Sequence, residues 1–209
     1  MAYVIYFGYI VETLLKQITM IKKLLLLILS VSAINFYSQD SDQSDINGAS
    51  VDKSVFEIVL GTDMVLFTNA AIALETKLAN RGALRTELGV WAGTWRSDDG
   101  TQDFIFVPKI QVEPRWYYNI EKRKSNGKEI SKNSANFLTP SISIATHDFK
   151  TMVLCYSLKW GMRRVVSEHF NYGFGIGFGL INFRYEVGNS SDNILIPFPD
   201  LQMRIGYTF

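Results

Sequence analysis

An alternation of apolar and polar side chains recurs along most of this chain and limits what it can fold into. The last nine residues, 201–209, show it clearly, with apolar or aromatic residues at odd positions and polar or very small ones at even positions. A period of two predicts a β-strand with one apolar face. A strand that reaches an aromatic residue at the edge of an apolar band is typical of the strand that closes a transmembrane barrel. The residues expected on the apolar face of this closing strand are Met203, Ile205, Tyr207 and Phe209.

Seven further segments carry the same pattern. The sequence thus predicts eight strands, at residues 55–61, 64–78, 84–95, 104–120, 137–146, 152–165, 170–186 and 201–209. An even number of strands suits a single-chain bacterial barrel, and it places both ends of the barrel domain on one side of the membrane. We therefore expect an all-β fold, an eight-stranded antiparallel up-and-down transmembrane β-barrel over residues 54–209.

Three local features modify this expectation. Pro108 and Pro114 fall on the apolar face of the fourth strand, and because each lacks a backbone donor we expect less regular pairing there. The alternation slips near Ile181, which predicts a β-bulge. Glycines occupy every second position from Gly173 to Gly179, so this face of the seventh strand is expected to be crowded.

The faces opposite the apolar ones carry charged residues of both signs. A soluble sandwich points such residues at water, whereas a membrane barrel turns them into its lumen. The apolar faces are rich in aromatic residues and continue from strand to strand, which favours the membrane barrel. Side chains fill a lumen of about eight strands, and buried charges persist when paired. We therefore predict a structural ion-pair network of seven basic and four acidic residues, namely Lys77, Arg85, Lys109, Arg115, Lys159, Arg163 and Arg204 with Glu57, Glu75, Glu87 and Glu113.

Composition agrees with this interpretation. Aromatic residues are abundant, with 14 Phe, 10 Tyr and 4 Trp, as suits strands and membrane interfaces. The 21 Lys and Arg balance 20 Asp and Glu, so no nucleic-acid partner is indicated. The single cysteine, Cys155, excludes an intrachain disulfide and is expected to be a small buried filler. Beyond residue 40 no run of about 18 apolar residues occurs, which argues against a helical membrane protein.

The N-terminal part reads as a targeting segment. Residues 20–38 combine Lys22 and Lys23 with an apolar run over 24–34 and a small residue, Ser38, before a polar stretch, which predicts a signal peptide cleaved near Ser38. An uncleaved anchor helix is the alternative. Residues 1–19 are expected to be an upstream extension, with translation starting at Met20. Residues 39–53 are expected to be a disordered leader, whose aspartates lack the glycine and distal glutamate of a calcium loop.

Four stretches carry a resemblance to a known family: ALRTELG at 83–89, VEPRWYYN at 112–119, SANFL at 134–138 and RIGYTF at 204–209. They resemble a mostly uncharacterised family of small Bacteroidetes-type outer-membrane β-barrel proteins. A signal segment that ends in FYSQ, at 36–39, fits the same group. The resemblance covers most of residues 54–209 and implies the fold and an outer-membrane location, but no activity.

Candidate chemistry is sparse. Some small outer-membrane barrels modify lipids, which requires a nucleophile beside a base. His147 and His169 are the only histidines, and the strand order places them on opposite sides of the membrane. Three serines are predicted to face inward: Ser141, Ser143 and Ser157. His147 is a candidate base, although a solvated turn is the simpler interpretation, and we expect no catalytic, metal or cofactor site.

A basic insert at residues 121–134 is predicted on the periplasmic side. It contains Lys122, Arg123, Lys124, Lys128 and Lys132 against two glutamates. Such a segment is able to bind an acidic partner or phospholipid headgroups, and a solvated turn is the simpler interpretation. The adjacent aromatic residues at 116–118 are predicted to form part of an interfacial girdle. The loops at 96–103, 146–150 and 187–198 are expected on the outer side.

These observations give one expected function and three alternatives. We expect a non-enzymatic protein of the cell outer membrane with a structural or binding role and a lumen filled by side chains. Its expected partners are outer-membrane lipid and, during biogenesis, the barrel-assembly machinery, and the protein is expected to be a monomer. The alternatives are a lipid-modifying enzyme with His147 as base, a narrow channel and a soluble secreted β-protein.

Overall fold

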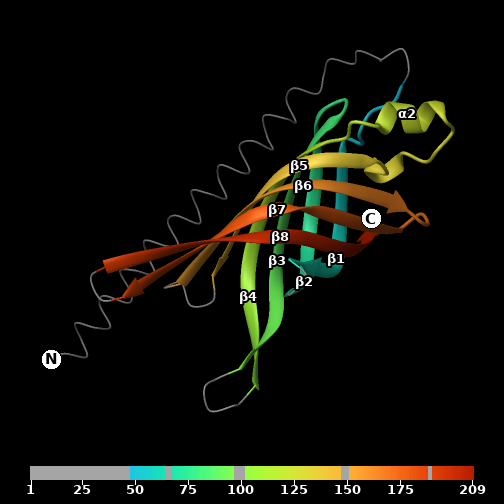
Figure 1. Cartoon of the computed structure of the whole chain (residues 1–209). Coiled ribbons are helices and arrows are strands. Elements are labelled where there is room, and N and C mark those ends of the chain that lie inside the picture. The colour runs from blue at the N-terminus through green and yellow to red at the C-terminus, as the bar shows by residue number, and fades with distance from the viewer. Residues whose placement is uncertain (1–47, 65–66, 97–101, 147–150, 188–189) are drawn as a thin grey trace. The chain divides into compact units, whose positions relative to one another are not determined.

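A computed structural model of the chain describes residues 48–64, 67–96, 102–146, 151–187 and 190–209 (Figure 1). Eight antiparallel strands pair in sequential order, and β1 also pairs with β8, so that the barrel closes. The predicted fold class, an eight-stranded up-and-down β-barrel, is therefore confirmed. The strands are β1 (Ser54–Asp63), β2 (Phe67–Ala79), β3 (Gly82–Arg96), β4 (Gln102–Trp116), β5 (Asn136–Thr146), β6 (Thr151–Val165), β7 (Phe170–Val187) and β8 (Ser190–Thr208).

One end of the barrel gathers the start of β1, the end of β8 and three of the strand connections. We call it the C-terminal end. The β2–β3 and β6–β7 connections are short, at residues 80–81 and 166–169, whereas the β4–β5 connection carries α2 (Ile120–Ser125) and the short 3-10 helix η2 (Ser131–Asn133). Figure 1 shows α2 and the C-terminus at this end.

Side chains alternate between the two faces of each strand, as β1 illustrates. Phe56, Ile58 and Leu60 are exposed on the outer face, whereas Glu57 and Val59 between them are buried in the lumen. The same arrangement, with apolar residues outside and a charged residue inside, continues through β2, where Ile72 and Leu74 are exposed and Glu75 is fully buried. Apolar residues thus cover the outside of the barrel and charged residues lie inside.

The strands form two groups of four, which Figure 1 shows running in different directions. Within each group the ladders are long; β7 and β8, for example, pair from Phe170↔Tyr207 to Val187↔Ser190. Between the groups they are short. β1 pairs with β8 only from Glu57↔Thr208 to Thr62↔Met203, and the β4–β5 register is broken between Val112↔Ile142 and Trp116↔Leu138. These two boundaries are referred to as the seams.

Proline explains the break in the β4–β5 seam. Pro114 of β4 and Pro140 of β5 fall in the gap of this register, and neither has a backbone N–H to donate. The Thr139 hydroxyl donates instead to the Pro114 carbonyl at 2.8 Å. The irregular pairing predicted at Pro114 is confirmed on this side, whereas the β3–β4 ladder continues unbroken through Pro108.

Two expectations about strand regularity are wrong. The β6–β7 and β7–β8 registers pass through Ile181 without a shift, so no bulge occurs there. Ile181 instead packs inward against an apolar cluster around Trp91 and Cys155, which makes both faces of β7 apolar at this point. Similarly, β8 begins at Ser190 because its backbone pairs with the extension of β7, so most of the loop expected at 187–198 is strand.

Two segments beside the C-terminal end also differ from expectation. The fourth strand ends at Trp116, four residues early, and Ile120 is fully buried in α2. Val51, expected in a disordered leader, is 2% exposed and its N–H donates to the Asn80 carbonyl. Asp52 accepts a hydrogen bond from the Lys132 N–H at 2.5 Å. Residues 49–53 are therefore packed against the barrel, and residues 39–47 lie outside the described ranges.

The crowded glycine face is confirmed at two positions. A Cβ atom on Gly177 would lie 2.1 Å from the Leu158 carbonyl oxygen, and one on Gly179 would lie 2.4 Å from the Phe198 ring. By contrast, a Cβ on Gly175 would meet nothing closer than 3.6 Å. Glycine at 177 therefore permits β6 and β7 to approach, whereas glycine at 175 is not required by the space around it.

We predict that Gly177→Ala destabilises the barrel by at least about 2 kcal/mol, because the new methyl group overlaps backbone that cannot move aside. Gly175→Ala, the matched control on the same face, is expected to cost less than about 1 kcal/mol. Urea unfolding of the two variants in detergent micelles measures both values. Equal stability of the two variants would contradict the close approach of β6 and β7.

Candidate functional site

The lumen holds a network of buried ion pairs, which we call the lumen network. Within the described residues it joins six carboxylates to six cations, drawn from every strand except β5 and β7. The carboxylates belong to Glu57, Asp63, Glu75, Glu87, Glu113 and Asp200, and the cations to Arg85, Lys109, Arg115, Lys159, Arg163 and Arg204. All twelve side chains are at most 8% exposed. Taken as ionised, they sum to zero charge.

Two carboxylates organise the part of the network nearest the C-terminal end. Glu57 forms short ion pairs with Arg85 and Arg163, and so connects β1 to β3 and to β6. Glu75 accepts from Arg115 at 3.0 Å, from the Tyr117 hydroxyl at 2.5 Å and from the Asn133 amide at 2.6 Å. Because Tyr117 and Asn133 belong to the β4–β5 connection, Glu75 ties that connection to the lumen.

Arg204 occupies the middle of the network. Its guanidinium lies 2.7 Å from a Glu87 oxygen and 3.2 Å from a Glu113 oxygen, so that β8 is linked to β3 and β4. Glu113 also accepts from Lys159 at 3.0 Å and forms an ion pair with Arg115. The four glutamates of the network thus each meet more than one cation, which helps to offset the cost of removing their charges from water.

Two acidic members of the lumen network, Asp63 and Asp200, were not predicted from the sequence. Asp63 forms a short ion pair with Lys109 and accepts from the Trp91 indole N–H at 2.7 Å. Asp200 accepts from the Ser157 hydroxyl at 2.6 Å and lies 3.3 Å from Lys159. Both aspartates lie just beyond the predicted strand ends, at 61 and 201. They nevertheless continue the alternation of their strands and occupy positions that face the lumen. Extending the alternation by one or two residues would have found them.

Lys77 does not join the network. Its ammonium group donates to the Ser50 hydroxyl at 3.3 Å near the C-terminal end, and the residue is only partly buried. The other ten predicted members all do. The predicted network had seven basic and four acidic residues. Without Lys77, and with Asp63 and Asp200, the network has six basic and six acidic residues.

Apolar clusters close the network at both ends. At the C-terminal end, Tyr117 and Ile120 pack with four other buried residues, Val51, Ala83, Ala135 and Phe137. Beyond Asp63, a second cluster contains Met64, Trp91, Ala145 and Cys155. Two cavities lined by network residues measure about 20 Å³ and about 10 Å³. Each holds about one water molecule, so the described side chains leave little space in these two parts of the lumen.

Among the described candidates for nucleophilic chemistry, no hydrogen bond or ring contact joins the serines to His169. Ser141 and Ser157 share a hydrogen bond of 2.7 Å, and Ser157 donates to Asp200. His169 instead stacks on Tyr207 at the C-terminal end, and its Nδ1 lies 3.0 Å from the Thr208 carbonyl oxygen. His147 lies outside the described residues. The described ranges contain no cluster of three or more potential metal ligands.

The residues predicted on the apolar face of the closing strand all lie on the outside. Phe209 packs against Phe56 of β1 with ring centroids 5.5 Å apart, and against Tyr207 at 5.1 Å. These contacts cover the C-terminal end of the β1–β8 seam. No helix in the described ranges is long and apolar enough to cross a membrane. The exposed apolar positions of this strand are Met203, Ile205, Tyr207 and Phe209.

We predict that Lys109→Met destabilises the barrel by about 3–5 kcal/mol, because it leaves the buried Asp63 carboxylate without its cation. Adding Asp63→Asn restores neutrality, so the double variant should be more stable than the sum of the single variants implies, by at least about 1 kcal/mol. A double-mutant cycle from urea unfolding measures this coupling. Lys77→Met is the control outside the network, and additive single costs would rule out the coupling.

Comparison of the chain with models of protein families and with curated proteins finds no match. The function is therefore argued from the geometry of the barrel.

Proposed function

We propose that the protein is an integral outer-membrane barrel with a structural or binding role, held in the membrane by its outer surface and closed by its lumen network. One observation carries this proposal: the side chains are inverted relative to a soluble protein, with apolar residues outside and paired charges inside. Phe178, for example, is 80% exposed, whereas Glu113 is fully buried. Water would leave this apolar surface unfavourably solvated, whereas lipid acyl chains match it.

The exposed apolar surface is continuous around the barrel. Soluble monomers seldom expose an apolar patch beyond a few hundred Å². Here each strand contributes exposed apolar or aromatic side chains to the outer surface, including Ile58, Leu60, Ile72, Leu88, Phe106, Ile142, Tyr156, Leu158, Ile176, Phe178, Leu180 and Ile205. This distribution supports a membrane barrel over a soluble secreted β-protein.

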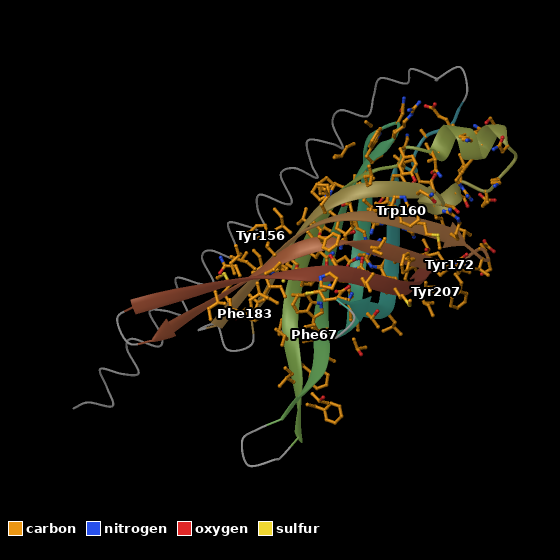
Figure 2. The ribbon with its side chains drawn as sticks, viewed as in Figure 1. Phe67, Tyr156, Trp160, Tyr172, Phe183 and Tyr207 are labelled. Atoms are coloured by element: carbon orange, nitrogen blue, oxygen red, sulfur yellow. The ribbon has the colours of Figure 1, made fainter. Side chains whose placement is uncertain are left out.

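Aromatic residues gather near the C-terminal end of this surface. Figure 2 shows Trp160, Tyr172 and Tyr207 there, on three adjacent strands. Trp116 and Tyr118 extend the same belt, with ring centroids 6.2 Å apart. Aromatic belts mark the level of lipid headgroups in transmembrane barrels. This end is assigned to the periplasmic side, where the chain enters and leaves an even-stranded barrel.

The filled lumen distinguishes an anchor from a channel. Cavities of about 20 Å³ and 10 Å³ leave no continuous water path among the side chains that line them. The lumen network crosses the same space, and an ion in transit would have to separate its pairs. We therefore propose a closed barrel rather than a channel, and we place binding on the surfaces outside the lumen.

The protein is expected in the detergent-extractable outer-membrane fraction and in a heat-modifiable form on gels, because a closed barrel resists unfolding by cold detergent. Fractionation and paired heated and unheated samples test both statements. A stable monomer in buffer without detergent would contradict the proposal.

Leu158→Arg is expected to block assembly into the membrane. Leu158 lies in the middle of β6 and is 65% exposed, so the guanidinium would meet the acyl chains at a cost of about 2–4 kcal/mol. Val166→Arg is the matched control, because Val166 is 70% exposed but lies in the β6–β7 turn. The heat-modifiable fraction of each variant in isolated membranes provides the measurement. Equal assembly of both variants would contradict the position of the membrane band.

A further inference from the structure

A basic cradle lies beside the aromatic belt at the C-terminal end, and the lumen network does not use it. It is a hollow between α2, the β4–α2 connection and the ends of β5 and β6. Its lining carries four cationic side chains and no carboxylate, with one aromatic and three amide residues beside them. The residues used below are Lys122, Arg123, Lys128 and Arg164, with Tyr118 and Asn136.

The cations of the cradle have no close acidic partner among the described residues. None of its four cations forms an ion pair with a described residue, in contrast to the cations of the lumen. Arg164 donates only to neutral acceptors, the Arg163 carbonyl at 2.6 Å and the Asn136 side-chain oxygen. Arg123 donates to the Glu129 carbonyl at 2.9 Å, and its buried Nε has no hydrogen-bond partner among the described residues.

The acidic residues of the same connection are engaged elsewhere. Glu121 is paired with Arg81 of the β2–β3 turn. The Glu129 carboxylate accepts from the Ser131 backbone N–H at 2.8 Å, and this hydrogen bond is the main cause that lowers the pKa of Glu129. Arg123 is a further cause of this lowering, so Glu129 offsets part of the charge of the cradle, which keeps a net positive charge from its four cationic side chains.

The cradle lies at the level where lipid headgroups are expected. Tyr118, which lines it, accepts a hydrogen bond from the Trp160 indole N–H at 2.8 Å. Arg164 occupies an outward-facing position of β6, as Leu158 and Trp160 do. Its backbone partner on β7 is Tyr172 of the aromatic belt. An outward-facing arginine beside an aromatic belt places its charge at the polar boundary of the membrane while its stem covers apolar surface.

We propose that the basic cradle binds the phosphate of an anionic phospholipid headgroup in the periplasmic leaflet. Arg123 and Arg164 are suited to the phosphate because guanidinium groups offer paired donors to its oxygens. Lys122 and Lys128 add positive charge at the rim. The acyl chains then continue along the apolar outer face of β5 and β6. This inference rests on the proposed membrane location, which sets the sidedness and the lipid source.

The test is native mass spectrometry of the full chain purified in detergent micelles, with phosphatidylglycerol or phosphatidylcholine added at equal concentration. The wild type is expected to retain more phosphatidylglycerol than phosphatidylcholine. The Lys128→Gln/Arg164→Gln variant is expected to retain about tenfold less phosphatidylglycerol, because each basic residue contributes separately to anionic-lipid binding. Lys53→Gln/Lys124→Gln loses the same charge outside the cradle and should stay within about twofold of the wild type.

Three outcomes would overturn the proposal: equal phosphatidylglycerol retention by the wild type and the cradle variant, an equal loss in the control variant, or displacement of the lipid by millimolar inorganic phosphate. The last would assign the cradle to a free anion. Heated and unheated gel samples of the same preparations separate this test from that of the proposed function. A normal heat shift without lipid retention removes the cradle alone, whereas loss of the shift in the wild type removes the membrane barrel.

Discussion

Charge neutrality in a closed lumen is the condition on which the rest of this barrel depends. A narrow barrel that turns its apolar faces outward has to fill its interior with the side chains that remain, and here twelve of these are the charged members of the lumen network. Burial of any one of them alone would cost several kcal/mol. Six carboxylates and six cations that share partners, such as Glu57 between Arg85 and Arg163, remove that cost together. The outer surface is then free to be apolar throughout.

Neutrality also explains why the ends of the barrel look as they do. Water entering the lumen would compete for the ion pairs, and the apolar clusters around Tyr117 and Trp91 cover the network on both sides. The β4–β5 connection contributes to this closure through Ile120, the one buried residue of its short helix. The same connection presents its basic side chains outward. One segment therefore closes the lumen and supplies the basic cradle.

The alternation of residues made the fold and most of the lumen network predictable, because strand parity alone decides which face a side chain joins. Prediction failed where the alternation of apolar and polar residues does not decide which face a side chain joins or where a strand ends. Ile120 follows the alternation of β4, but Pro114 and the turn into α2 end the strand before it. Ile181 looked out of phase because apolar residues line both faces there. Asp63 and Asp200 were lost at strand ends, which composition locates poorly. The cradle combines distant segments, and no spacing in the sequence reveals that.

The two seams have a mechanical consequence. Backbone ladders hold β1–β4 together and β5–β8 together, but join the two groups weakly. Ion pairs in the interior also join them, from Glu57 and Glu75 to Arg163, and from Glu87 and Glu113 to Arg204. These pairs act as internal struts. Lateral pressure from a bilayer would tend to flatten such a barrel by changing the angle between the two groups of strands. The interior ion pairs oppose this change at the two seams, where the backbone ladders are shortest.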